Sequence, residues 1–189
     1  MISVQVKSKK RVAEHGEVFT AEREVKAMCD LVADECLRID SRFLEPACGE
    51  GNFLIEVFSR KLATVNSQPE YERNSILALS SLYGIDILPD NVAICRDNLF
   101  AMWDNENFSD DLRKSARRIL ELNIICGNTI EYKTISGKPI IFSEWTFPNN
   151  DSKILRRDFD FQTLTEDSMY KDIPVKEYKP IDYWRIYEL

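Results

Sequence analysis

The sequence alternates short apolar segments with longer amphipathic ones, and this alternation constrains the fold more than any other feature. Three short apolar segments are typical of buried strands: residues 42–47, 83–87 and 123–128. The intervening segments carry apolar residues at three- and four-residue steps, which predicts helices over residues 53–62, 71–82, 89–100 and 112–120. Strands that alternate with helices predict an α/β fold with a mostly parallel sheet.

Two further segments extend this pattern at its ends. Apolar residues from Val25 to Cys36 recur at helical steps, and Thr20 is the expected N-cap of that helix. Residues 140–147 predict a fourth strand, whereas the sequence beyond Pro148 is polar, acidic and weakly periodic. We therefore expect four strands in all.

The composition is that of an ordinary globular protein. The 189 residues suit one core, and 44% of them are hydrophobic. We expect a domain over residues 1–148 with an N-terminal helical element. Residues 149–189 are expected to form a C-terminal extension, and one alternative is that this extension packs on the same domain. The apolar runs are far shorter than a membrane span and the N-terminus is polar, so we expect a cytoplasmic protein without a membrane segment.

Cysteine and histidine usage favours a site without metal. The five cysteines lie singly, without a C-x-x-C pair, so we expect reduced thiols rather than disulfides or zinc ligands. His15 is the only histidine, which leaves hydrolase triads and histidine-based metal sites little to draw on.

The net charge argues against strong DNA binding by this chain alone. A charge of -7 and a pI near 4.9 repel phosphate backbones, whereas free-standing DNA-binding proteins usually have a basic surface. One basic cluster, residues 7–11, could touch phosphates, but a solvated arm is the favoured interpretation.

A glycine turn at the end of the first strand is the strongest candidate binding feature. In residues 46–53, Gly49 and Gly51 permit a turn that lets the backbone approach a ligand, and the next helix points its free N–H groups at that ligand. Asp86 closes the next strand at the same sheet edge, where its oxygens can accept both hydroxyls of a ribose. The alternative role for Asp86 is helix capping near Pro89.

The whole segment Glu45-Pro-Ala-Cys-Gly-Glu-Gly-Asn-Phe53 is more specific than its glycines. It resembles the D-P-A-C-G-S-G-x-F motif of N6-adenine DNA methyltransferases from restriction-modification systems. Upstream, His15-Gly-Glu-Val-Phe-Thr20 resembles the family's G-E-x-F-T-P element, with Ala21 in place of the proline. Downstream, Gly84-Ile-Asp-Ile87 resembles the ribose-binding strand, and Cys126-Gly-Asn128 resembles the G-D or G-N element beside the adenine.

The resemblance implies a Rossmann-like S-adenosylmethionine-dependent methyltransferase fold, here with a truncated parallel sheet and helices on both faces. It implies that Glu45 orders the methionine amino group or the loop, that Asp86 binds ribose, and that Asn128 lies near the adenine amino group. Carboxylates and amides have the hydrogen-bonding groups for these roles. The cofactor-binding residues expected on this basis are Phe19, Thr20, Glu45, Pro46, Ala47, Cys48, Gly49, Gly51, Asn52, Phe53, Asp86, Ile87 and Asn128.

Two of these residues also have a simpler role. Phe53 is expected to pack behind the loop rather than to contact the cofactor, since aromatic residues after such turns face the sheet. Cys48 is expected to serve the conformation of the turn rather than to act as a nucleophile.

The family's catalytic N-P-P-Y or D-P-P-Y element is missing, because the chain contains no Pro-Pro pair. That element holds the target amino group and stacks on the flipped base. Residues 140–149 offer Glu144 with Trp145 and Phe147, but these aromatics are expected to pack within a strand. The catalytic residues are therefore unknown, and the resemblance covers only the cofactor-binding half.

Three functions follow as hypotheses. The first is an S-adenosylmethionine-binding modification subunit whose DNA adenine-N6 methylation needs a partner, with DNA contacted through that partner in a homo- or hetero-oligomer. It would use direct methyl displacement without metal. The second is a non-catalytic acidic interaction or antirestriction protein that retains the fold. The third is a methyltransferase acting on RNA, protein or a small molecule.

Overall fold

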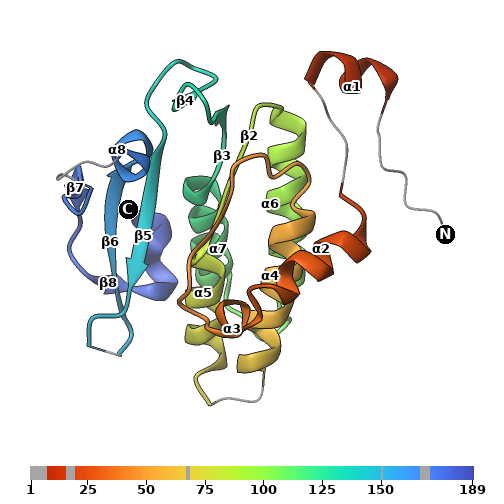
Figure 1. Ribbon diagram of the computed structural model, residues 1–189. Helices are drawn as coiled ribbons and strands as arrows, with labels where there is room; N and C mark the ends of the chain where they lie inside the picture. Colours follow the sequence, from red (N-terminus) through yellow and green to blue (C-terminus); the bar gives the residue numbers. More distant parts are fainter. Residues whose placement is uncertain (1–7, 16–19, 67–68, 150, 167–170) are drawn as a thin grey trace.

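The computed structural model describes residues 8–15, 20–66, 69–149, 151–166 and 171–189, which form an α/β fold with two sheets (Figure 1). In the first sheet, β1 (Phe43–Glu45), β2 (Leu82–Asp86) and β3 (Ile124–Asn128) are parallel neighbours in that order. The short β4 (Lys133–Thr134) is antiparallel to β3, so this sheet is mixed. The three predicted parallel strands are confirmed to within a few residues.

Helices connect these strands in the predicted order. The helix α4 (Asn52–Val65) follows β1, and α6 (Pro89–Trp103) follows β2 with a proline in its first turn. The helices α5 (Tyr71–Ser80) and α7 (Asp110–Asn123) lead into β2 and β3. In α7, the Ser109 hydroxyl caps the N-terminus by accepting from the Leu112 N–H at 3.2 Å.

The N-terminal helical region is divided where a single helix was expected. It comprises α1 (Lys9–His15), α2 (Glu22–Asp30) and α3 (Ala33–Leu37). The predicted N-cap role of Thr20 is wrong, because the N-cap of α2 is Ala21, which makes no side-chain capping bond. The helix breaks at Val32, whose backbone leaves the helical region (φ -125°, ψ 35°) after the chain tightens into i→i−3 hydrogen bonds.

The basic cluster near the N-terminus is not simply a solvated arm. Arg11 in α1 donates to both carboxylate oxygens of Asp90, at 2.6 and 3.3 Å, and to the Asn91 side-chain oxygen at 3.1 Å. This bidentate geometry joins α1 to the first turn of α6.

The last third of the chain contains a second, antiparallel sheet. The strands β5 (Ile141–Thr146) and β6 (Lys153–Asp160) form a hairpin, and β7 (Lys176–Glu177) and β8 (Ile181–Asp182) both pair with β6. The helix α8 (Phe161–Thr165) follows β6, and the 3-10 helix η1 (Tyr183–Glu188) packs along α7. The expectation of four strands was therefore too low, and the longest strand lies in the supposed polar extension.

The strand β6 escaped prediction because two of its inward positions are charged. Arg156 and Asp158 are only 5% and 6% exposed and interrupt the apolar alternation that marks a strand. They satisfy each other: Arg156 Nε lies 2.8 Å from Asp158 Oδ1, and Arg156 Nη2 lies 2.9 Å from Asp158 Oδ2. A buried charge is tolerated when it is paired in this way.

The second sheet covers the face of β2 that points away from α4 and α6, as Figure 1 shows. The Tyr83 hydroxyl donates to the Ser143 carbonyl at 3.0 Å, and its ring meets the Phe142 ring edge-on at 5.3 Å. On the opposite face, a Cβ at Gly84 would lie 3.0 Å from Cys48 Sγ. The predicted α/β class is confirmed, but an antiparallel sheet stands where helices were expected on the second face.

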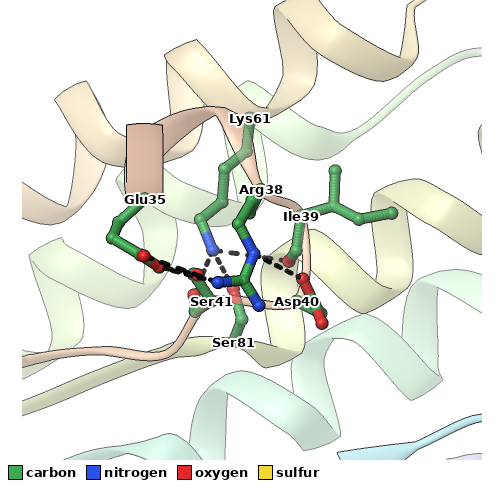
Figure 2. Close-up of polar contacts among 7 residues, drawn as sticks. All are labelled: Glu35, Arg38, Ile39, Asp40, Ser41, Lys61 and Ser81. Carbon is green, nitrogen blue, oxygen red and sulfur yellow. Dashed lines mark hydrogen bonds and ion pairs between the residues drawn. The ribbon is translucent and has the colours of Figure 1, made fainter. Parts of the chain in front are cut away.

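A buried lysine fastens the N-terminal ends of β1 and β2 (Figure 2). Lys61 of α4 has no exposed surface, and its Nζ donates to the carbonyls of Ile39, at 3.3 Å, and Ser41 and to the Ser81 hydroxyl, at 2.7 Å. Burial lowers the pKa of Lys61 to about 8. One side chain thus joins α4 to the segments that precede both strands.

Candidate cofactor-binding site

A cleft of about 670 Å³ lies where the carboxyl ends of β1, β2 and β3 meet. Most of the residues expected from the sequence line it: Thr20, Glu45, Pro46, Ala47, Cys48, Gly49, Asn52, Phe53, Asp86, Ile87 and Asn128. Gly51 does not line it, and Phe19 lies outside the described residues.

The glycine turn adopts a backbone that other residues rarely take. Gly49 and Gly51 have φ values of 52° and 93°, and Gly51 is the N-cap of α4. A Cβ at Gly51 would lie 2.7 Å from Cys95 Sγ, closer than such atoms approach. Gly51 therefore acts through its backbone, which aims the start of α4 toward the cleft.

Asp86 holds the turn in place. Its Oδ2 accepts from the Gly49 N–H at 2.9 Å, and its Oδ1 accepts from the Leu88 N–H at 2.8 Å and from Asn91 Nδ2 at 3.3 Å. The alternative of helix capping is not seen as such, because the N-cap of α6 is Leu88, which has no side-chain capping bond, and Asp86 instead accepts from the N–H of that residue. A carboxylate has about four acceptor sites, so one remains for a ligand hydroxyl.

Glu45 is half-buried at the end of β1. Burial raises the pKa of its carboxyl group, and a hydrogen bond from the Ala47 N–H, at 3.4 Å, opposes that shift. The contact bends the chain back over Pro46, so Glu45 presents a weakly solvated carboxylate to the cleft.

The loop after β3 closes the opposite wall. Asn128 Oδ1 accepts from the backbone N–H groups of Ile130, at 2.9 Å, and Glu131, at 3.3 Å. Thr129 Oγ1 donates to the Pro46 carbonyl at 2.6 Å and so ties this loop to the turn after β1. The Asn128 amide NH₂ has no acceptor within the described parts of the chain, so this cleft-lining residue retains a donor for a ligand.

The two residues with a simpler expected role behave differently from each other. The Phe53 ring lies 6.5 Å from the Phe43 ring and also lines the cleft, so it packs and faces the ligand space at once. Hydrogen bonding with the Cys95 thiol and burial raise the pKa of Cys48 far above its usual value. A protonated thiol under the turn suits a conformational role.

Several residues of the cleft were not expected from the sequence. They are Val25, Met28, Leu88, Asn91, Gly127, Thr129 and Ile130. Met28 had a signal, because it lies on the apolar side of the N-terminal helix and is half exposed. Asn91 and Thr129 had none, since their roles depend on contacts with Asp86 and Pro46 that arise only in the folded chain.

The electrostatic character of the cleft is distinctive. Its described lining includes two carboxylates, Glu45 and Asp86, and no lysine, arginine or histidine. Such a cleft favours a ligand with positive charge over one that carries several phosphates.

The described residues show neither a metal-binding cluster nor a membrane-spanning helix. Among the described residues, no group of three or more histidine, cysteine, aspartate or glutamate side chains is arranged to hold a metal ion. No helix in the same residues combines the length and apolar character needed to cross a bilayer.

A comparison of the chain with known protein families, curated proteins and solved structures finds no match.

Proposed function

We propose that the cleft binds S-adenosylmethionine and that the chain is the cofactor-binding part of a methyltransferase with a Rossmann-like fold. The observation that carries this proposal is a glycine turn at the carboxyl edge of a parallel sheet, beside two carboxylates and no described basic side chain. The resemblance to N6-adenine DNA methyltransferases adds the specific ligand.

The charge of the lining separates this ligand from other nucleotide cofactors. A dinucleotide or nucleoside triphosphate brings several negative charges, which would lie beside Glu45 and Asp86 without a compensating cation from the described lining. S-adenosylmethionine carries an ammonium and a sulfonium against one carboxylate. It therefore has the sign of charge that this cleft favours.

Each polar group has a counterpart on that ligand. The first N–H groups of α4 suit the methionine carboxylate. Glu45 suits the ammonium, and the remaining acceptor site of Asp86 suits a ribose hydroxyl. With its oxygen used by its own loop, Asn128 is left to donate to an adenine ring nitrogen, between the apolar side chains of Ile87 and Ile130.

Methyl transfer requires a second element that holds the acceptor. The chain lacks the Pro-Pro pair of the family's catalytic motif, and its net charge of -7 opposes direct DNA binding. We therefore assign acceptor binding to a partner subunit of a restriction-modification system, with DNA adenine as the acceptor.

Calorimetric titration with S-adenosylmethionine tests the binding step. The native chain is expected to bind with a dissociation constant in the micromolar range, and ATP is expected to give no saturable heat. Asp86→Asn should weaken binding about tenfold or more, because it removes charge from the ribose contact. Asp97→Asn is the matched control, since its side chain on α6 is 76% exposed and does not line the cleft. No binding by the native chain would overturn the proposal.

A second candidate is an acidic interaction or antirestriction protein that uses the fold without catalysis. The net charge and the missing motif favour it. RNA, protein or small-molecule acceptors form a third class, which shares the same cofactor step. Binding of S-adenosylmethionine separates the two enzymatic candidates from the non-catalytic one.

A further inference from the structure

A second cleft, of about 520 Å³, lies between the edge of β1 and the antiparallel sheet. It shares no lining residue with the candidate cofactor cleft. Leu44 and Tyr83, which line it, alternate along their strands with residues that face α4, so it opens on the other face of the first sheet. We call it the aromatic-arginine cleft.

The inner wall of this cleft is built from aromatic rings. Phe142, Phe159 and Phe161 are nearly buried, and the Phe142 and Phe161 rings meet edge-on at 5.4 Å. At the mouth, Leu44 and Leu164 are exposed over 41% and 42% of their surface. Exposed leucine side chains at the entrance and buried phenylalanine rings behind them form an apolar cleft that suits a flat ring.

The polar wall carries an excess of positive charge. Arg42 Nη1 and Arg157 Nη2 both approach the same oxygen of Glu144, at 3.5 and 3.1 Å. Two guanidinium groups on one carboxylate leave one positive charge, and Lys171 and Asp172 at the rim offset each other. Among the described residues, moreover, the buried Arg157 Nε has no hydrogen-bond partner. Although the chain has a net charge of -7, the local excess of positive charge in this wall would attract an anion.

We propose that the aromatic-arginine cleft binds a planar ring that bears an anionic group, the chemistry shared by a nucleoside monophosphate and an aromatic carboxylate. The ring lies between Leu44 and Leu164 against the phenylalanine wall. The anion accepts from the N–H groups of Arg42 and Arg157, which Glu144 holds side by side. The volume is within the range of small-molecule sites.

Calorimetry with four probes tests this site: adenosine 5′-monophosphate, 2-naphthoate, adenosine and inorganic phosphate. One of the first two is expected to bind saturably with one site per chain. The two partial probes should bind at least about tenfold more weakly, because each lacks the ring or the anion. Which of the first two binds more tightly identifies the source of the ligand.

Two exposed positions give variants that are expected to keep the fold, because Arg42 is 62% exposed in its side chain and Leu164 is 42% exposed. Arg42→Gln removes one guanidinium and Leu164→Glu sets a carboxylate at the mouth, so both should weaken binding about tenfold or more. Their controls are Arg23→Gln and Ile135→Glu, at positions that are 91% exposed in the side chain and 64% exposed. Asp86→Asn should leave binding in the aromatic-arginine cleft unchanged. The test of this cleft can therefore be distinguished from the test of S-adenosylmethionine binding. Absence of saturable binding, or equal binding by Arg42→Gln and Arg23→Gln, would refute the site.

Discussion

Lys61 illustrates how one residue can define the geometry beneath a binding site. Its ammonium reaches three acceptors on the segments that enter β1 and β2, and the carboxyl ends of those strands carry Glu45 and Asp86. From the sequence alone, a lysine within a helix is expected on the solvent side, because lysine is rarely buried. Only the folded chain shows that its whole length is enclosed.

We expect Lys61→Met to lower the free energy of unfolding, since it removes the donor from the part-buried Ile39 carbonyl and the buried Ser41 carbonyl. The loss at pH 7 should be about 1–3 kcal/mol, measured by urea denaturation. Lys114→Met serves as the control, because its side chain is 60% exposed and its ammonium contacts Asp111 and the Tyr187 ring at the surface. An equal loss in both variants would contradict the role assigned to Lys61.

The difference in stability between the native chain and Lys61→Met should also depend on pH. The pKa of Lys61 is about 8 in the folded chain, below the value of about 10.4 for a free lysine. Between these values the unfolded chain binds the proton and the folded chain releases it, so stability rises with pH. The stability of the native chain relative to Lys61→Met should therefore increase from pH 8 to pH 10. A flat or falling difference would show that the folded amine keeps its proton.

At the scale of elements, the glycine turn and α6 are fitted to each other. Gly51→Ala introduces a Cβ at a positive φ and 2.7 Å from Cys95 Sγ, and we expect it to destabilise the fold by more than about 1 kcal/mol. Gly137→Ala is a matched control, because Gly137 has a φ of 78° but its added Cβ would meet no described atom within 4 Å other than those of its chain neighbours. Thermal unfolding should show the larger loss for Gly51→Ala.

A second substitution assigns the cause of that loss. Adding Cys95→Ala to Gly51→Ala removes the sulfur atom, so the double variant should lose less stability than the sum of the two single variants. Additive losses, or equal losses for Gly51→Ala and Gly137→Ala, would mean that the contact with Cys95 is relieved at little cost.

The predictability of each element follows from what stabilises it. The strands β1 to β3 and the helices α4 to α7 were predictable because most of their buried positions are apolar and recur at a regular period. The strand β6 was not, since Arg156 and Asp158 occupy inward positions that become tolerable through their pairing and through hydrogen bonds with the Ser143 and Tyr178 hydroxyls. Nor was the break between α2 and α3, where no glycine or proline marks the end of the helix.

At the scale of the whole molecule, the cleft was easier to predict than the architecture around it. Parallel strands bring their carboxyl ends to one edge, so Glu45, Asp86 and Asn128 had to meet once the three strands were recognised. The second sheet depends on contacts such as that of Tyr83 with Ser143, which are 60 residues apart and leave no local pattern. Contacts between residues so far apart in the sequence form only when the elements pack together, so they cannot be predicted from local patterns.

The proposed division of labour gives a prediction for the assembled system. Transfer of a tritiated methyl group to DNA should be undetectable with this chain alone, because it lacks the catalytic motif. Transfer should appear when a partner that carries Asn-Pro-Pro-Tyr is added, and it should fall in Asp86→Asn but not in Asp97→Asn. Activity of the isolated chain would contradict the need for a partner.

The strand β1 pairs with β2 on one side only in the described structure, and this open edge bears on solubility at high concentration. Unpaired edges recruit other chains and seed aggregates when they are long, flat and uncharged. Here the strand has three residues, Arg42 precedes it, and Pro46 follows closely without an N–H to donate. This edge is therefore too short and too interrupted to pair with strands of further copies of the chain. We expect that the unpaired edge does not lead to polymerisation.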